Sequence, residues 1–352
     1  MYKRQTRYRL THKPVPKLII QIPCLNEAET LPQTLADLPQ HIAGIDTIEW
    51  LVIDDGSSDN TSDVARQHGV HHIVRFRKQK GLAAAFMAGL DEAVRQGADY
   101  IVNTDADNQY VGDDVATLLR PLLDGTADIV VGDRNIRTLR NMPMVKRWLQ
   151  QIGSWVVRQV SNTRIPDTTS GFRAYTREAA LRQTLVSEFS YTLETIIQAG
   201  KKRMAVEHVP IATNEKTRPS RLFDSVFTYI KKSAATIVRI YAMYEPLKVF
   251  TLAGLVFFGV GFAISLRFLF YYFDGEGSGH LQSLILSAVL MIVGFQIILI
   301  GLMADVISAS RKLTEELLYR VRSLELSLQT RRTPAQKSTN TCLLYTSPSP
   351  RD

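Results

Sequence analysis

Two long stretches without a charged residue, Val249–Leu266 and Leu281–Ala304, constrain the fold of this chain more than any other feature. A helix needs roughly 20 apolar residues to cross about 30 Å of hydrocarbon, and both stretches meet that requirement. Core helices of soluble proteins are rarely free of charge over such a length. We therefore predict two transmembrane helices, at residues 248–273 and 281–304.

The charges around these stretches predict how the hairpin crosses the bilayer. The connecting loop, residues 274–280, contains no lysine or arginine, whereas basic residues lie on both outer flanks: Lys231, Lys232, Arg239, Lys248, Arg311, Lys312, Arg320 and Arg322. Because basic flanks stay on the cytoplasmic side, the sequence predicts a multi-pass membrane protein with two spans and both termini in the cytoplasm.

The formal net charge of +8 is distributed unevenly, with one basic cluster in residues 1–17, which we expect to form a flexible arm. Basic charge beside apolar spans indicates a lipid bilayer as partner, and the sequence contains no motif typical of nucleic-acid binding. Cys24 and Cys342 are too far apart to form a metal-ligand motif, which fits a reducing compartment. No apolar core follows the basic arm, so we do not interpret it as a signal peptide.

The segments that flank the hairpin each have two interpretations. Residues 222–245 combine a helical apolar period with basic residues, which predicts a juxtamembrane amphipathic helix lying in the membrane interface or docked on the soluble domain. Residues 305–330 predict a cytoplasmic C-terminal helix whose narrow apolar stripe either joins subunits of a homo-oligomer or packs on the same chain. Residues 331–352 predict a disordered tail, and the residue pattern of its last part is unlike the rest of the chain, so that part is interpreted as non-native.

Between residues 18 and 221, short apolar runs alternate with helical patterns, which predicts an α/β domain with a mostly parallel, Rossmann-like sheet covered by helices on both faces. The expected strands are Leu18–Ile22, Trp50–Ile53, Ile73–Phe76, a strand from Tyr100, Ile129–Val131 and Ala205–Val209. One helix is expected through Leu31–Leu38, and a second, which Asp59 or Thr61 can cap, is expected to end at about His68. Four more helices are expected over Gly81–Gln96, Asp113–Leu123, Pro143–Val160 and Glu188–Gly200.

Carboxylates follow four of these strands, in Asn26-Glu27, Asp54-Asp55, Asp105-Ala106-Asp107 and Asp133-Arg134. The carboxyl ends of parallel strands meet at one edge of a sheet, where open α/β sheets bind their ligands. Such an acidic rim would repel an anion unless a cation intervened, so a metal–diphosphate complex explains it best. Asp105, Asp107 and Gln109 offer the oxygen ligands that Mg²⁺ or Mn²⁺ prefers, although a lone acidic turn can also be merely solvated.

Other nucleotide-binding motifs are missing. The first strand is followed by Pro23-Cys24-Leu25-Asn26-Glu27 and not by the glycine-rich turn of dinucleotide-binding dehydrogenases. The sequence also contains no Walker A motif. Both observations argue against the common dehydrogenase and phosphate-binding-loop enzymes.

Five motifs occur together in the order typical of family 2 glycosyltransferases: Pro23-x-x-Asn26-Glu27, Asp54-Asp55-Gly56-Ser57, Lys80-Gly81, Asp105-x-Asp107-x-Gln109 and Ser170-Gly171-Phe172-Arg173. Over Leu18–Leu222 the chain resembles the polyprenyl-phosphate sugar transferases, such as dolichyl-phosphate mannose synthases and undecaprenyl-phosphate glucosyltransferases. The resemblance implies a GT-A glycosyltransferase domain at residues 18–221, a nucleotide-sugar donor of the GDP-mannose or UDP-glucose type, a divalent cation, and an undecaprenyl or dolichyl phosphate acceptor.

The resemblance also implies roles for single residues. Nucleotide-sugar contacts are expected from Pro23, Leu25, Glu27, Ile53, Asp55, Asp105, Ala106 and Arg134. The metal is expected at Asp105, Asp107 and Gln109, and the acceptor phosphate at Ser170, Arg173, Ser220 and Arg221. Catalytic roles fall to Asp107, Arg134, Arg173, Arg218 and Arg221. The chain departs from the family pattern at Pro219, which replaces a small residue, and at Arg221, which replaces a lysine.

The implied reaction is an inverting hexosyl transfer to a lipid phosphate, which is already ionised at neutral pH and needs no strong general base. Two other functions remain open from the motifs. A processive polysaccharide synthase shares the acidic motif, but Met144 stands where the glutamine of its Q-x-x-R-W motif would precede Arg147-Trp148. An inactive membrane scaffold of the same fold is the other alternative.

Overall fold

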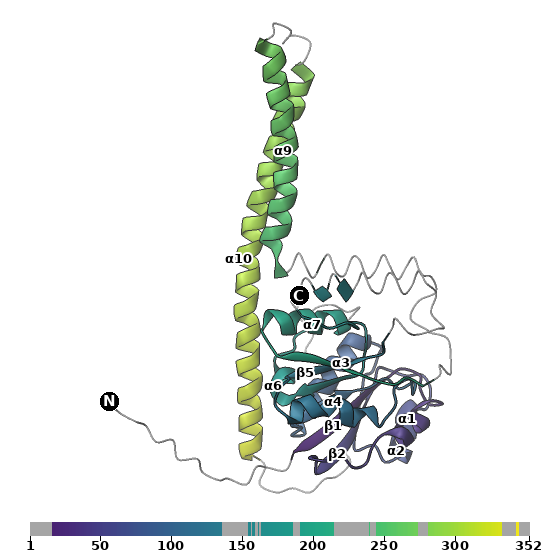
Figure 1. The fold of residues 1–352 in the computed structure, drawn as a ribbon. Helices are drawn as coiled ribbons and strands as arrows, with labels where there is room; N and C mark the ends of the chain where they lie inside the picture. The colour runs from purple at the N-terminus through teal and green to yellow at the C-terminus, as the bar shows by residue number, and fades with distance from the viewer. Residues whose placement is uncertain are drawn as a thin grey trace. The chain divides into compact units, whose positions relative to one another are not determined.

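A computed structural model describes residues 16–135, 154–155, 157–158, 161, 163–185, 191–214, 239, 244–273, 281–332 and 343–344. The chain divides into two compact units. The first unit contains Met1–Thr228 together with Ser323–Asp352, and the second unit contains Tyr229–Arg322. Figure 1 draws both units, which are described separately below.

The first unit is built on one mixed sheet with the strand order β7-β5-β6-β4-β1-β2-β3-β8. Strand β6 is antiparallel to β4 and β5, and every other pairing between these strands is parallel. The strands are β1 (Lys17–Cys24), β2 (Thr47–Asp54), β3 (His72–Arg75), β4 (Tyr100–Asn103), β5 (Ile129–Asp133), β6 (Arg173–Thr176), β7 (Val206–Pro210) and β8 (Leu343–Leu344).

Both faces of the sheet are covered by helices, because successive side chains of each buried strand point to opposite faces. On one face, alternate residues of β1 (Leu18, Ile20, Ile22) pack in a core with helices α1 (Leu31–Asp37), α2 (Thr61–Gln67) and α4 (Asp114–Leu123). On the other face, Ile19 packs in a second core with α3 (Leu82–Arg95), α6 (Arg177–Leu181) and α7 (Tyr191–Lys201). This α/β/α layering confirms the predicted fold class.

The predicted strands and most predicted helices are present with small changes in their bounds. Two further elements were not predicted, β6 and α6, which together cover Arg173–Leu181. Strand β6 is four residues long and lies antiparallel between β4 and β5. A short strand of this kind, inserted out of order, carries no alternating pattern long enough to recognise.

In the second unit, two long helices form a hairpin: α9 (Pro246–Phe273) and α10 (Leu281–Arg332), which continues into the first unit. By length and composition, Pro246–Phe273 and Leu281–Leu328 are apolar enough to cross a membrane. Gly254 and Gly294 lie where the two helices touch, since a Cβ atom on Gly254 would come within 2.6 Å of the Gly294 carbonyl oxygen. The prediction of two long apolar helices is confirmed.

Several predicted segments lie wholly or largely outside the described residues. They include most of the expected helix Pro143–Val160, most of the amphipathic segment 222–245 and the flexible arm at residues 1–17. The cytoplasmic helix predicted at 305–330 is continuous with the second long apolar helix, because α10 runs unbroken from Leu281 to Arg332. Within the tail, Leu343–Leu344 forms the short edge strand β8 beside β3.

Candidate active site

The carboxyl ends of β1, β2, β4 and β5 lie at the same edge of the sheet, because these strands run in the same direction. Strand β1 sits between β2 and β4, so the connections leave it toward opposite sides. Open α/β sheets bind ligands at such a switch in strand order. The loops that begin here are the four acidic segments that the sequence singled out.

The loop after β4 holds Asp105 and Asp107 in a turn that is anchored on several sides. The Asp107 side chain accepts a hydrogen bond from the Gln109 backbone N–H at 3.1 Å. Between them, Asn108 has a φ of 51°, a left-handed conformation that asparagine tolerates well. The hydroxyl of buried Thr34, from α1, donates to the Ala106 carbonyl oxygen at 3.0 Å. The turn therefore presents its two carboxylates in a defined geometry.

The electrostatics of this turn favour a bound cation. Burial, followed by the negative charge of Asp107, raises the pKa of Asp105 to about 7, while Arg134 opposes that shift. A carboxylate that is destabilised in this way gains from a positive partner. Within the described part of the chain, no three His, Cys, Asp or Glu side chains form a metal site by themselves. Two carboxylates fit Mg²⁺ or Mn²⁺ whose remaining ligands come from substrate phosphates and water.

Arg134 follows β5 and lies close enough to Asp105 to influence its pKa. Its Nε atom donates to Asp167 Oδ2 at 2.7 Å, and its Nη2 atom donates to Asp167 Oδ1 at 3.1 Å and to Thr169 Oγ1 at 2.9 Å. Burial works to lower the pKa of Arg134, but nearby Tyr110, Asp167 and Asp105 hold it above its ordinary value. The guanidinium is thus charged, oriented and next to the acidic turn.

The Ser170–Arg173 segment lies against the same turn. A Cβ atom on Gly171 would come within 3.1 Å of both carboxylate oxygens of Asp105, so only glycine allows this approach without displacement. Ser170 is fully buried, and within the described residues its Oγ atom has no hydrogen-bond partner. The structure therefore brings the predicted acceptor-phosphate segment next to the predicted metal segment.

Arg173 was predicted to contact the acceptor phosphate, but its side chain points into the protein. Its side chain is fully buried at the start of β6. The guanidinium donates to the carbonyl oxygens of Ser170 (2.8 Å) and Thr168 (2.9 Å) and to Thr195 Oγ1 (2.5 Å). These hydrogen bonds hold the loop that precedes it. The geometry supports a scaffold role for Arg173, because a fully buried guanidinium has no open side for a substrate.

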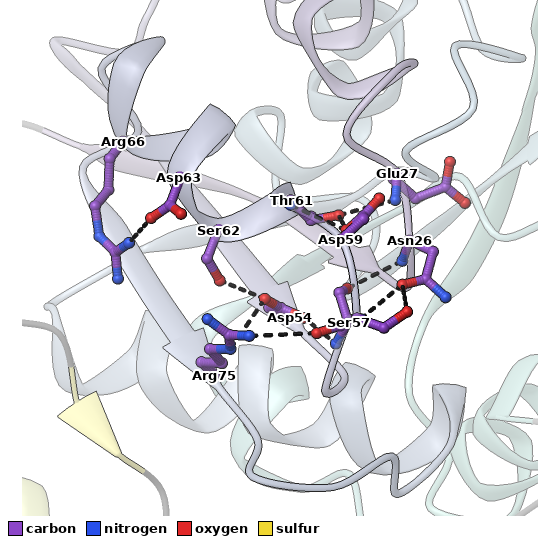
Figure 2. A network of polar contacts seen from close by, with 11 residues as sticks. Asn26, Glu27, Asp54, Ser57, Asp59, Thr61, Ser62, Asp63, Arg66 and Arg75 are labelled. Atoms are coloured by element: carbon purple, nitrogen blue, oxygen red, sulfur yellow. Dashed lines mark hydrogen bonds and ion pairs between the residues drawn. The ribbon is translucent and has the colours of Figure 1, made fainter.

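The loops after β1 and β2 are locked together by a polar network (Figure 2). The buried Asp54 carboxylate accepts hydrogen bonds from the Ser57 backbone N–H at 2.7 Å and from the Ser62 hydroxyl. Asn26, with a φ of 55°, donates its backbone N–H to Ser57 Oγ at 3.0 Å and accepts from the Ser58 backbone N–H at 2.8 Å. This network fixes the loop that carries Glu27.

Glu27 and Asp55 both lie at this edge, and each already holds part of the protein. Glu27 Oε2 accepts from the Thr30 hydroxyl at 2.6 Å, just before α1. Asp55 accepts from the backbone N–H groups of Lys80 and Gly81, at 2.7 and 2.9 Å. Burial, the larger effect, raises the pKa of Asp55 although these two hydrogen bonds lower it. Asp55 therefore shapes the turn before α3.

The other predicted residues divide into three groups. Leu25 is half-buried in the loop after β1, whereas the side chains of Pro23 and Ile53 are buried within their strands. Ile53 is fully buried in the core beneath α3, so its side chain does not reach a ligand. The remaining predicted residues lie outside the described residues: Arg218, Ser220 and Arg221.

Sequence reasoning missed three buried residues that shape the site. Tyr110 accepts the Gly171 backbone N–H at 3.1 Å, and Asn103 donates to the Gly171 carbonyl oxygen at 2.8 Å. Asp167 pairs with Arg134. Tyr110 and Asp167 stand next to motifs that were recognised, so their adjacency was the available signal. Asn103 sits inside a strand, where its polar side chain at a core position could have drawn attention.

Two family profiles match this chain. The profile described as glycosyl transferase family 2 matches residues 19–182, and the profile described as GtrB C-terminal hairpin matches residues 245–310. The chain belongs to glycosyl transferase family 2. The two matched segments correspond to the sheet domain with its acidic edge and to the apolar helical hairpin.

Two relatives are each matched over most of their own length. The chain is 28% identical over 214 residues to the UDP-N-acetylglucosamine–dolichyl-phosphate N-acetylglucosaminyltransferase of Methanococcus voltae, covering 54% of this chain and 83% of that protein. It is 29% identical over 217 residues to the polyprenol monophosphomannose synthase of Mycolicibacterium smegmatis, covering 58% and 80%.

A solved structure supports the fold of this glycosyltransferase. Glucosyl-3-phosphoglycerate synthase from Mycobacterium tuberculosis, crystallised with Mn²⁺, UDP-glucose and phosphoglyceric acid, superposes with a TM-score of 0.51. The match covers 64% of this chain and 80% of the other, at 19% sequence identity. At that identity the likeness concerns the fold alone, and it agrees with the GT-A architecture.

Proposed function

We propose that this glycosyltransferase moves a hexose from a nucleotide-sugar to a polyprenyl phosphate at the membrane surface. One observation carries the proposal: the carboxylates of Asp105 and Asp107 share a sheet edge with the oriented guanidinium of Arg134. Acidic and basic groups together suit a diphosphate bridged to the protein by a cation. The apolar hairpin and the names of the two relatives support a lipid phosphate as acceptor.

The donor is proposed to lie across the carboxyl ends of β1, β2 and β4. Leu25, Glu27 and the backbone around Pro23 and Asp55 would surround the nucleoside, and Ala106 would lie beside the diphosphate. Because Asp55 already accepts two backbone hydrogen bonds, we expect it to position the nucleoside pocket more than to bind the base itself. The two relatives carry different sugars in their names, so the proposal extends to hexoses as a class.

Mg²⁺ or Mn²⁺ is proposed at Asp105 and Asp107, with Gln109 as a further oxygen ligand. When bound, the cation would neutralise the negative charge that develops on the departing diphosphate. Arg134 supports the same charge from its fixed position against Asp167, and its planar fork suits phosphate oxygens. The chain's own contribution is therefore to orient the donor and to stabilise the leaving group.

The acceptor needs little activation. An ionised oxygen of the lipid phosphate attacks the sugar C1, and the bond from C1 to the diphosphate oxygen breaks with its electron pair leaving on the nucleoside diphosphate. A single displacement inverts the configuration at C1, and no proton has to be removed from the nucleophile. Ser170 is proposed to lie near this phosphate, and Arg218, Ser220 and Arg221 are proposed to complete its site.

The membrane topology belongs to the same proposal. The hairpin would cross the bilayer twice, with the GT-A domain and both termini on the cytoplasmic side, where the basic flanks are retained. The segment at residues 222–245 would lie along the interface and keep the site close to the lipid headgroup.

The test is to incubate membranes containing the full chain with a panel of UDP- and GDP-sugars and with undecaprenyl or dolichyl phosphate. Mass spectrometry of the lipid fraction should find a polyprenyl monophosphate that carries one hexose, formed only with added Mg²⁺ or Mn²⁺. Absence of such a glycolipid with every donor would overturn the proposal. A polymeric product would instead favour the processive synthase alternative.

A further inference from the structure

Tyr110 is a buried residue beside the candidate active site, and it belongs to none of the five sequence motifs. It follows the acidic turn and is only 5% exposed. Its ring stacks on the ring of Phe172, with the centroids 4.8 Å apart and the planes at 10°. The ring is thus fixed between the loop after β4 and the loop before β6.

The Tyr110 hydroxyl has two polar neighbours. It accepts a hydrogen bond from the Gly171 backbone N–H at 3.1 Å. The buried Asp105 carboxylate is the other neighbour, close enough for its charge to act on the hydroxyl. The hydroxyl therefore holds the Gly171 backbone N–H close to the Asp105 carboxylate.

The Gly171 backbone is held from its other side as well. Asn103 Nδ2 donates to the Gly171 carbonyl oxygen at 2.8 Å, while Asn103 Oδ1 accepts from Gln21 Nε2 at 2.8 Å. All three residues, Gln21, Asn103 and Tyr110, are at most 5% exposed. The position of the Ser170-Gly171 segment is consequently set by side chains from β1, β4 and the acidic turn.

Close packing makes this arrangement sensitive to small displacements. A Cβ atom on Gly171 would lie 3.1 Å from both oxygens of Asp105 and 2.8 Å from the Tyr191 hydroxyl. Any shift of the loop toward Asp105 would therefore meet the carboxylate directly. Tyr110 is the side chain that holds the Gly171 N–H beside this carboxylate.

We propose that Tyr110 is a positioning residue that couples the cation-binding carboxylate of Asp105 to the acceptor-phosphate segment Ser170-Gly171. This inference rests on the proposed function and adds to it. By holding Gly171 against both oxygens of Asp105, the Tyr110 hydroxyl limits how far that carboxylate can turn. By fixing the Gly171 N–H, it sets the distance between the donor diphosphate and the incoming acceptor.

Tyr110→Phe tests the proposal because it removes the hydroxyl and keeps the ring that stacks on Phe172. We expect kcat to fall by about tenfold to a hundredfold, as expected when a buried N–H loses its acceptor, with the donor KM changed by less than about threefold. The Mn²⁺ concentration at half-saturation, measured by electron paramagnetic resonance of free Mn²⁺ without substrate, should rise by about threefold to tenfold.

Tyr100→Phe is the matched control, since Tyr100 begins β4 and lies partly buried in the core below the site. It should leave kcat and Mn²⁺ binding unchanged. If the Tyr110→Phe variant matches the wild type in both kcat and Mn²⁺ half-saturation, the inference is overturned. If the wild type forms no glycolipid, the proposed function fails, and the Mn²⁺ titration alone then supports or overturns the coupling.

Gly171→Ala provides a second test if Tyr110→Phe lowers the melting temperature. The added Cβ atom would press on Asp105 while the hydroxyl remains, so the same rise in Mn²⁺ half-saturation is expected. Unchanged Mn²⁺ binding in a folded Gly171→Ala variant would contradict a coupling between this segment and the carboxylate.

Discussion

The guanidinium of Arg134 is clamped by the carboxylate of Asp167 through two hydrogen bonds, of 2.7 and 3.1 Å. Asp167 is 1% exposed, and its pKa is lowered because the pairing with Arg134 and hydrogen bonds from Thr169 outweigh burial. A buried ion pair of this kind orients its side chains more than it stabilises the fold, because the free energy lost by desolvating both charges is nearly as large as the free energy gained by pairing them. Arg134 is thereby aimed before any substrate arrives.

Removing one member of this pair should separate stability from activity. Asp167→Asn leaves a buried guanidinium without its counter-charge and should lower the free energy of unfolding by about 3 kcal/mol. The double variant Arg134→Gln/Asp167→Asn should recover most of that loss, because no unpaired charge remains. Its transfer rate should nevertheless stay at least tenfold below the wild type, since the phosphate contact is gone.

Thermal unfolding and initial rates of glycolipid formation check this prediction. A double variant that recovers both stability and activity would show that Arg134 serves only the fold. Arg134→Lys gives a further comparison, because it keeps the charge and loses the planar fork.

Asp107→Ala should abolish cation-dependent transfer while leaving the fold intact. Among the described residues, the Asp107 side chain makes one hydrogen bond, which it accepts from the Gln109 N–H, so the structural loss is small. Loss of a cation ligand in the transition state should lower kcat by at least about a hundredfold. The control is Asp113→Ala, which removes an exposed carboxylate at the start of α4 that makes no capping hydrogen bond.

Rates at several Mn²⁺ concentrations distinguish these two variants. The Asp113→Ala rates should follow the wild-type curve. Turnover by the Asp107→Ala variant that still depends on Mn²⁺ with the wild-type midpoint would contradict the metal assignment.

The acid stability of the domain should depend on Glu49, the third residue of β2. Its Oε2 atom lies 2.7 Å from Lys17 Nζ and 2.6 Å from His72 Nε2. Burial tends to raise the pKa of Glu49, but its hydrogen bonds to His72 and Lys17 prevail and lower it to about 2. A carboxyl group whose pKa is lower in the folded state than in the unfolded state stabilises the protein at every pH above its unfolded-state pKa. For Glu49 this contribution disappears as the pH falls from about 4.5 toward 2.

Glu49→Gln removes that contribution. The variant should be about 1–2 kcal/mol less stable than the wild type at pH 6, after allowance for partial exposure, and equally stable near pH 2. Unfolding of the full chain in detergent, followed by tryptophan fluorescence between pH 2 and 6, measures the difference. A constant difference across this range would contradict the assigned linkage.

The sequence predicted the layers of the fold well because buried parallel strands and long apolar helices carry strong local patterns. It also placed Asp105, Asp107 and Arg134 together, since strand ends converge whatever the intervening loops contain. It could not predict the burial of Arg173, because the Ser-Gly-Phe-Arg motif gives no sign that the arginine begins an antiparallel strand. Its guanidinium satisfies local carbonyl groups, which only the tertiary structure reveals.

Contacts between distant segments were equally hidden. The Tyr110 hydroxyl meets Gly171, 61 positions later, and Asn103 meets the same residue 68 positions later. Asn103 ends an apolar run and Tyr110 follows the acidic turn, and nothing in the linear order pairs either residue with Gly171. Such pairings follow from the strand order β6-β4-β1, which the sequence pattern did not specify.

The apolar hairpin should depend on close helix contact at Gly254 and Gly294. A Cβ atom on Gly294 would lie 2.6 Å from the Phe258 backbone nitrogen and 2.7 Å from the Gly254 carbonyl oxygen, so a side chain must force the helices apart. Helices in lipid associate chiefly through such close packing, because the surrounding acyl chains are as apolar as the helices and the hydrophobic effect does not drive them together. Gly294→Val should therefore weaken the hairpin.

Gly259→Val is the matched control, since it lies on α9 with nothing within 4 Å of its Cβ position. We expect the Gly294→Val protein to unfold or aggregate in detergent at a temperature at least about 5 °C below that of the wild type, and Gly259→Val to remain within about 2 °C. Both substitutions add the same volume and the same β-branched side chain to an apolar helix, so propensity and hydrophobicity are matched. Equal losses in the two variants would mean that the contact between α9 and α10 does not stabilise the hairpin.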